Sequence, residues 1–159
     1  MKQIFPLLLL VLLSCNIDNT KNTETIKQNA GEINAIKNIL INQQKCWNNG
    51  DIDGFMEGYW NSEELIFTSL NHKPIYGWNN NLKRYKNSYQ TKSTMGELQF
   101  EILNLNLISK TTATLKGKWK LIREEDLPNG LFWIDLRKFD NNWLITKDST
   151  ISFELSTNL

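Results

Sequence analysis

Two neighbouring stretches of the sequence, 98–107 (LQFEILNLNL) and 112–121 (TATLKGKWKL), alternate between apolar and polar residues. Alternation with a period of two predicts β-strands that bury one face. In the first stretch the apolar residues change parity between Ile102 and Leu103, which indicates a β-bulge. In the second stretch Gly117 indicates a bend or a close approach of another segment. Together the two stretches predict a strongly bent antiparallel sheet.

The sequence on either side extends this sheet and adds helices. Two more strand-like segments follow turn residues near the C-terminal end, at 131–139 and 143–149. Upstream, apolar residues recur at helical spacing over residues 31–48, 52–59 and 78–89, which predicts three helices. A short strand-like segment, 65–69, lies between the second and the third. Helices followed by a meander predict an α+β fold in which N-terminal helices pack on one face of the bent sheet.

The N-terminus has the pattern of a secretory signal. Lys2 precedes an apolar run from Ile4 to Leu13, and the small residue Ser14 stands before Cys15. This pattern predicts a signal peptide over residues 1–14, too short for a membrane-spanning helix. Residues 12–15 (LLSC) resemble the bacterial lipobox, in which the cysteine is lipidated; the alternative is a plain signal peptide with an incidental cysteine.

The residue after Cys15 refines the expected location. Asn16 at this position favours sorting to the outer membrane, so we expect a bacterial envelope protein anchored through Cys15 and facing the periplasm. The polar segment 15–30 cannot form a core and predicts a flexible tether. We expect one folded domain over residues 31–155 and a short tail, 156–159.

Composition narrows the class of function. The 159 residues include 6 Trp, 4 Tyr and 7 Phe, which favours a dense core or an aromatic-lined cavity. The net charge of +1 falls to zero once the signal peptide and its Lys2 are removed, so nothing favours a nucleic-acid partner. His72 is the only histidine, and Cys46 is the only cysteine besides Cys15. We therefore expect neither a metal site nor a cofactor.

Between residues 33 and 151 the chain carries short motifs in a characteristic order. They are Trp47–Asp51, Tyr59–Trp60, Tyr76–Trp78, Arg84–Tyr85, Met95–Gly96, Trp119–Leu121 and Trp143–Ile145. These motifs resemble the nuclear transport factor 2-like superfamily, which includes ketosteroid isomerases and polyketide cyclases, and within it an uncharacterised bacterial branch. The resemblance implies a cone-shaped, cystatin-like fold with a ligand between the helices and the concave sheet. It implies less about activity, because one fold hosts many functions.

From this resemblance we select six residues as candidates for a ligand site: Trp60, Tyr76, Tyr89, Trp119, Arg123 and Phe132. The aromatic residues could instead belong to the core. Arg123 shares the parity of Trp119, so its guanidinium could bind an acidic group of a ligand. The alternative is that Arg123 pairs in solvent with an acidic neighbour among residues 124–126.

Three functions are compatible with these residues. We favour a protein that binds a small, partly apolar molecule without turnover. The first alternative is an isomerase, cyclase or hydratase with Asp148 as the acid–base group and Tyr76 or Tyr89 as a donor. The resembled branch usually has an Asp-His pair here, whereas this chain has Asp148 followed by Ser149, which counts against that chemistry. The second alternative is a homodimeric interaction module with Trp133 on the outer face of the sheet.

Overall fold

The computed structural model describes residues 19–70 and 72–153. Its elements are α1 (Asn19–Asn48), α2 (Ile52–Met56), β1 (Ile66–Ser69), β2 (Ile75–Tyr76), α3 (Trp78–Ser88), α4 (Lys92–Met95), β3 (Glu97–Leu107), β4 (Thr112–Ile122), β5 (Asn129–Phe139) and β6 (Asn142–Ser152). The signal peptide, Cys15 and the tail 156–159 lie outside the described residues, so our expectations for them stay predictions.

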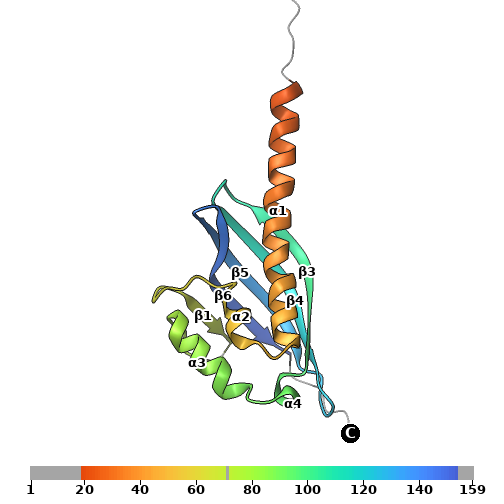
Figure 1. Cartoon of the computed structure of the whole chain (residues 1–159), viewed down its shortest axis with the longest axis vertical. Helices are drawn as coiled ribbons and strands as arrows, with labels where there is room; N and C mark the ends of the chain where they lie inside the picture. Colours follow the sequence, from red (N-terminus) through yellow and green to blue (C-terminus); the bar gives the residue numbers. More distant parts are fainter. Residues whose placement is uncertain (1–18, 71, 154–159) are drawn as a thin grey trace, which may run out of the picture.

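In this part of the chain six strands form one curled sheet, in the order β2-β1-β6-β5-β4-β3 (Figure 1). The four long strands β3 to β6 form the expected antiparallel meander. The sequence did not predict a partner for β1, which pairs with β6 in parallel and places Phe67 opposite Asp148. The sheet is therefore mixed, and the helices cover its concave face, where the core lies.

Two features accompany the bend of the sheet. The register of β3 against β4 shifts between Ile102 and Asn104, which confirms the predicted bulge. On the next strand pair Gly117 lies directly opposite Phe132. A Cβ on Gly117 would lie 2.4 Å from the Phe132 ring and 2.8 Å from the carbonyl oxygen of Glu101. Gly117 therefore allows the close approach that its place in the strand predicted.

Helix α1 is longer than expected. It begins at Asn19, so residues 19–30 are helical rather than the flexible tether that we expected. The reason is that Lys, Glu and Gln are good helix formers, and a helix that is already nucleated extends at little cost. Its first turns project beyond the sheet in Figure 1, and the side chains of residues 26–30 are exposed. Within the described ranges no helix, α1 included, is long and apolar enough to cross a membrane.

Polar contacts attach both ends of the docked part of α1 to the sheet. Glu32 accepts hydrogen bonds from Lys138 Nζ and Trp143 Nε1, each at 2.7 Å. These hydrogen bonds lower the pKa of Glu32. At the other end Asn48 accepts from the backbone N–H of Leu98 at 2.7 Å and donates to its carbonyl at 3.0 Å. Since β3 is an edge strand, Asn48 satisfies groups that another strand would otherwise pair.

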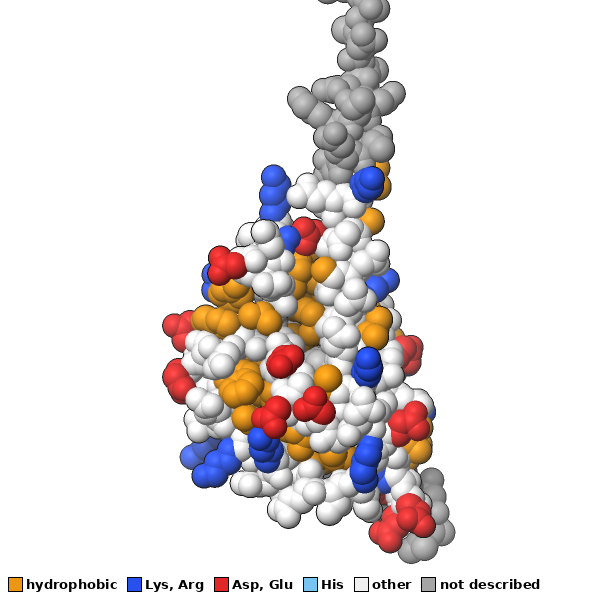
Figure 2. All heavy atoms as spheres, viewed as in Figure 1, with side chains coloured by type: hydrophobic (Ala, Val, Ile, Leu, Met, Phe, Trp, Pro, Cys, Tyr) orange, Lys and Arg blue, Asp and Glu red, His pale blue; other side chains and the backbone are white. Residues whose placement is uncertain are grey.

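The convex face of the sheet carries the polar residues of the alternating strands. Asp135 is exposed there. Trp133, the expected interface anchor, is half-buried with Lys116 Nζ 5.2 Å from its ring centroid. Homodimerisation through Trp133 stays a prediction. On the face shown in Figure 2, Lys and Arg side chains are interspersed with Asp and Glu.

Replacing Gly117 by Ala should lower the free energy of unfolding by about 1–3 kcal/mol, because the new methyl group must displace the Phe132 ring and the β3 backbone. The matched control is Gly31→Ala on α1, where an added Cβ meets nothing within 4 Å. That substitution should stabilise the protein by up to about 1 kcal/mol through helix propensity. Urea unfolding measures both. Equal effects of the two substitutions would contradict the close approach at Gly117.

Candidate functional site

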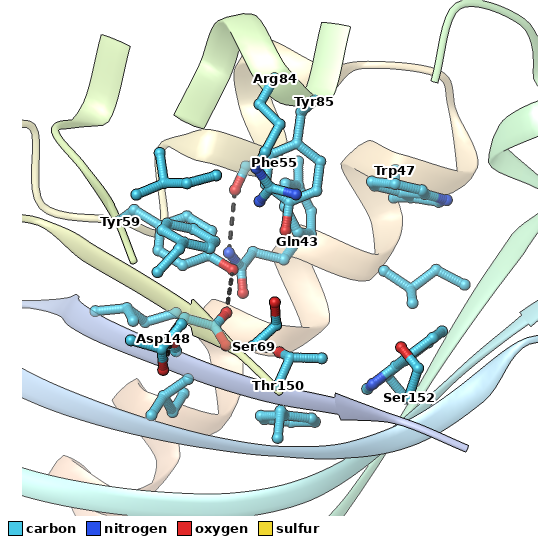
Figure 3. Close-up of a pocket in the computed structure, with 18 of the residues that line it drawn as sticks. Gln43, Trp47, Phe55, Tyr59, Ser69, Arg84, Tyr85, Asp148, Thr150 and Ser152 are labelled. Atoms are coloured by element: carbon cyan, nitrogen blue, oxygen red, sulfur yellow. Dashed lines mark hydrogen bonds between the residues drawn. The ribbon is translucent and has the colours of Figure 1, made fainter. Parts of the chain in front are cut away.

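A cavity of about 510 Å³ lies between the helices and the concave face of the sheet. Helices α1, α2 and α3 contribute one wall, and strands β1, β3, β4, β5 and β6 contribute the other. The lining side chains include Gln43, Trp47, Phe55, Tyr59, Phe67, Ser69, Arg84, Tyr85, Tyr89, Trp119, Phe132, Asp148, Thr150 and Ser152 (Figure 3). His72 and Lys73, which lie in the loop between β1 and β2, also line the cavity and are exposed.

Six aromatic rings, five from the helices or the residues just after them and one from strand β1, line the cavity together, and we refer to them as the aromatic cluster. They are Trp47, Phe55, Tyr59, Phe67, Tyr85 and Tyr89. The centroids of contacting pairs lie 4.7–6.0 Å apart, most of them in edge-to-face geometry. Such pairs contribute roughly 0.5–1.5 kcal/mol each beyond the area they bury. The cluster therefore gives the cavity a firm apolar wall.

Asp148 brings a carboxyl group to the cavity. It is 7% exposed and accepts hydrogen bonds from the Tyr59 hydroxyl at Oδ2 and the Thr150 hydroxyl at Oδ1, both at 2.9 Å (Figure 3). Burial raises the pKa of Asp148, and the two hydrogen bonds and the positive charge of Arg84 offset this only in part. Burial also raises the pKa of Tyr59 well above its ordinary value, so this hydroxyl stays protonated and donates.

A register shift in β6 explains why Asp148 faces inward. Ile145 and Asp148 are both buried although they are three residues apart, which in a regular strand would place them on opposite faces. The pairing of β5 with β6 shifts between Asp135 and Leu136, and this irregularity changes the parity of β6. The inward position of Asp148 therefore comes from the strand pairing.

Arg84 brings a positive charge to the same cavity from α3. Its Cζ lies 4.5 Å from the ring centroid of Tyr85 and 5.4 Å from that of Phe67. These contacts hold the guanidinium against the aromatic cluster. Within the described residues its buried Nε has no hydrogen-bond partner.

The structure places four of the seven proposed site residues on the cavity. Tyr89, Trp119, Phe132 and Asp148 line it. Phe132 also packs edge-on against Phe100, with ring centroids 5.3 Å apart.

The other three proposed residues lie elsewhere. Tyr59 lines the cavity, but the next residue, Trp60, does not. The ring of Trp60 stacks on that of Phe139, with ring centroids 5.0 Å apart. Tyr76 is 55% exposed at the edge of the sheet. Arg123 lies just past the end of β4, and its Nε pairs with Asp126 Oδ1 at 2.6 Å, which is the alternative considered above.

The tyrosine donors proposed for acid–base chemistry also need correction. The hydroxyl that contacts Asp148 is that of Tyr59, rather than that of Tyr76 or Tyr89.

Among the polar residues of the cavity that sequence reasoning missed are Gln43, Arg84 and Tyr85. Gln43 is 2% exposed and donates to the Phe55 carbonyl at 3.1 Å. The helical spacing of polar residues on α3 could have identified Arg84. Arg84 follows Asn81 by three residues, so the two share a face of α3, and Asn81 is buried. Polar residues that recur at helical spacing beside an apolar stripe are expected to lie at the edge of the helix face that packs against the rest of the protein.

Metal chemistry finds no support in the described ranges. Within residues 19–70 and 72–153 no three His, Cys, Asp or Glu side chains are grouped so that they could hold a metal ion. The ionisable groups among the described lining residues are the Asp148 carboxyl group, tyrosine hydroxyls, the Arg84 guanidinium and, in the exposed loop between β1 and β2, His72 and Lys73.

Comparison with known proteins gives structural matches. No protein-family model and no curated protein matches the chain. An NTF-2 like protein of unknown function from Shewanella oneidensis MR-1 is 38% identical with a TM-score of 0.73, over 76% of this chain and 98% of that one. A ketosteroid isomerase-like protein from Erwinia carotovora atroseptica SCRI1043 is 14% identical with a TM-score of 0.64, over 78% of this chain and 98% of that one. An NTF2-like protein with a cystatin-like fold from Novosphingobium aromaticivorans is 9% identical with a TM-score of 0.68, over 89% of this chain and 95% of that one. The last two show the fold alone.

Replacing Asp148 by Asn should increase the free energy of unfolding near neutral pH. Because the pKa of Asp148 is raised in the folded state, its ionisation costs stability as the pH rises through that folded-state pKa. The advantage of the variant should vanish below the pKa of an unfolded Asp, about 4. Urea unfolding of both proteins across this pH range measures the difference. If the difference in free energy of unfolding between the two proteins does not grow in favour of the variant as the pH rises, the raised pKa is contradicted.

Proposed function

The chain belongs to the NTF2-like family, and we propose that it binds a small, partly apolar molecule in the cavity between its helices and its sheet. The observation that carries this proposal is the cavity of about 510 Å³ with aromatic side chains on both walls. Pockets of about 300–1,000 Å³ with mostly apolar walls and a few polar groups are typical of small-molecule sites. The leading proposal is binding without turnover.

The proposed location follows from the N-terminal sequence. We propose that Cys15 is lipidated after removal of residues 1–14 and anchors the protein in the bacterial envelope, at the outer membrane facing the periplasm. The first turns of α1, which project beyond the sheet in Figure 1, then act as a spacer. A helix rises about 1.5 Å per residue, so residues 19–31 add roughly 18 Å between the anchor and the sheet.

A second candidate function is proton-transfer catalysis on a ligand bound in the same cavity. It rests on the buried Asp148 carboxyl, whose raised pKa brings it closer to the range in which a group both accepts and returns a proton. Tyr59 would hold this carboxyl in place, and Arg84 would supply positive charge for a developing oxyanion. The reaction class would be an isomerisation, cyclisation or dehydration.

The neutral probe 1-N-phenylnaphthylamine should bind saturably in the cavity. Its fluorescence should rise, and the indole N–H signal of Trp119 should shift in the ¹⁵N–¹H NMR spectrum, because Trp119 lines the cavity. Trp133 is the internal control, since it lies on the convex face of the sheet. Equal shifts of the two signals, or no binding, would contradict the proposed function.

The lipid anchor predicts a specific loss on mutation. In a bacterial host that expresses the whole chain, Cys15→Ser should abolish incorporation of a labelled fatty acid and should move the protein from the membrane fraction to the soluble fraction. Cys46→Ser should change neither property, because Cys46 lies within α1. Membrane retention of the Cys15→Ser variant would contradict the anchor.

The catalytic candidate predicts exchange of carbon-bound protons. With 2-tetralone in D₂O, the wild type should accelerate deuterium uptake next to the carbonyl, and Asp148→Asn should reduce the rate to that of buffer. Asp135→Asn on the convex face is the matched control and should leave the rate unchanged. If the wild type causes no acceleration, or if Asp148→Asn retains it, this candidate fails while the binding proposal stands.

A further inference from the structure

Two buried N–H donors on the cavity wall have no hydrogen-bond partner within the described part of the chain: the Nε of Arg84 and the Nε1 of Trp119. Buried polar groups in native proteins are nearly always paired, because an unpaired donor forfeits its hydrogen bonds to water. Trp119 Nε1 is a neutral donor that any ligand oxygen can satisfy. Arg84 carries a full positive charge, so its free donor says more about the class of ligand.

Asp148 does not fill the role of partner to Arg84. Its Oδ2 accepts from Tyr59 and its Oδ1 accepts from Thr150, so each carboxyl oxygen already has a hydrogen bond. The close-up in Figure 3 shows Arg84 on the helix side and Asp148 on β6, with Tyr59 in contact with Asp148 between them. Both residues are described, and no ion pair joins them.

Cation–π contacts restrain the orientation of Arg84. Its guanidinium carbon lies 4.5 Å from the ring centroid of Tyr85 and 5.4 Å from that of Phe67, while its buried Nε has no hydrogen-bond partner among the described residues. A guanidinium held in this way presents donors in a rigid fork, which matches the two oxygens of a carboxylate.

The charges that face the cavity favour a single negative charge on the ligand. The ionisable side chains of its lining, apart from the tyrosines, are Arg84, Lys73, His72 and Asp148. Two of them, Arg84 and Lys73, are cationic, and Asp148 is the one acid among the described lining residues. Even with Asp148 ionised, the cavity therefore carries one net positive charge.

We propose that the ligand of this cavity is an amphipathic carboxylate whose acid group accepts hydrogen bonds from Arg84 and whose apolar body lies against the aromatic cluster. This inference rests on the proposed function, since it names the class of molecule that the same cavity takes. It assigns to Arg84 the recognition of an acidic group that the sequence had suggested for Arg123.

The test compares 2-naphthylacetate with 2-naphthylacetamide, which share one aromatic body and differ in charge. Titration calorimetry should show that the wild type binds the acid at least tenfold more tightly than the amide. Arg84→Gln should remove this preference. Lys83→Gln is the matched control, because Lys83 is exposed on the same helix and does not line the cavity, and it should keep the preference.

Binding of neutral 1-N-phenylnaphthylamine to the same proteins separates the possible failures. If the wild type binds this neutral probe but does not prefer the acid, the inference fails and the proposed function stands. If it binds neither, both fail. If Arg84→Gln still binds the neutral probe and still prefers the acid, recognition by Arg84 is overturned. The comparison of acid with amide on the wild type needs no variant, so it decides the question even if Arg84→Gln does not fold.

Discussion

The contact between Gly117 and the ring of Phe132 is the constraint on which the shape of the cavity depends. The Phe132 ring occupies the space that a side chain at position 117 would need, because a Cβ on Gly117 would lie 2.4 Å from that ring. Beside this contact the register of β3 shifts, and the sheet bends around the helices. A bent sheet presents a concave face, and helices that are straight cylinders leave space against it. The cavity is that space.

The helices bring different chemistry to this concave face. The part of helix α1 that packs on the sheet is attached at both ends, through Glu32 and Asn48, and so keeps a fixed position over the strands. Helices α2 and α3 complete the aromatic cluster, which leaves few polar groups on the helix side. Arg84 and Asp148 then face a largely apolar space, where charges interact more strongly than in water. Ligand selectivity should therefore depend on very few side chains.

The sequence predicted the elements well and the site in part. A period of two in 98–107 and 112–121 locates the strands, and the change of parity at Ile102 locates the bulge, because both patterns depend on neighbours along the chain. Phe132 and Trp119, which we selected from the family resemblance, line the cavity. Trp60 and Arg123 do not line the cavity, because each lies where the chain turns away from the concave face. Residue type alone does not reveal where an element ends.

Local periodicity in the sequence determined the α+β class, the bent meander and the aromatic character of the interior, because side chains one turn or two residues apart share a face whatever surrounds them. Tertiary structure alone decided the chemistry of the cavity. Asp148 faces inward because β6 slips against β5, and β1 pairs with β6 in parallel through contacts far apart in sequence. The packing of α3 brings Arg84 to the same space as Asp148. Such juxtapositions depend on register and helix docking, which are set by long-range contacts.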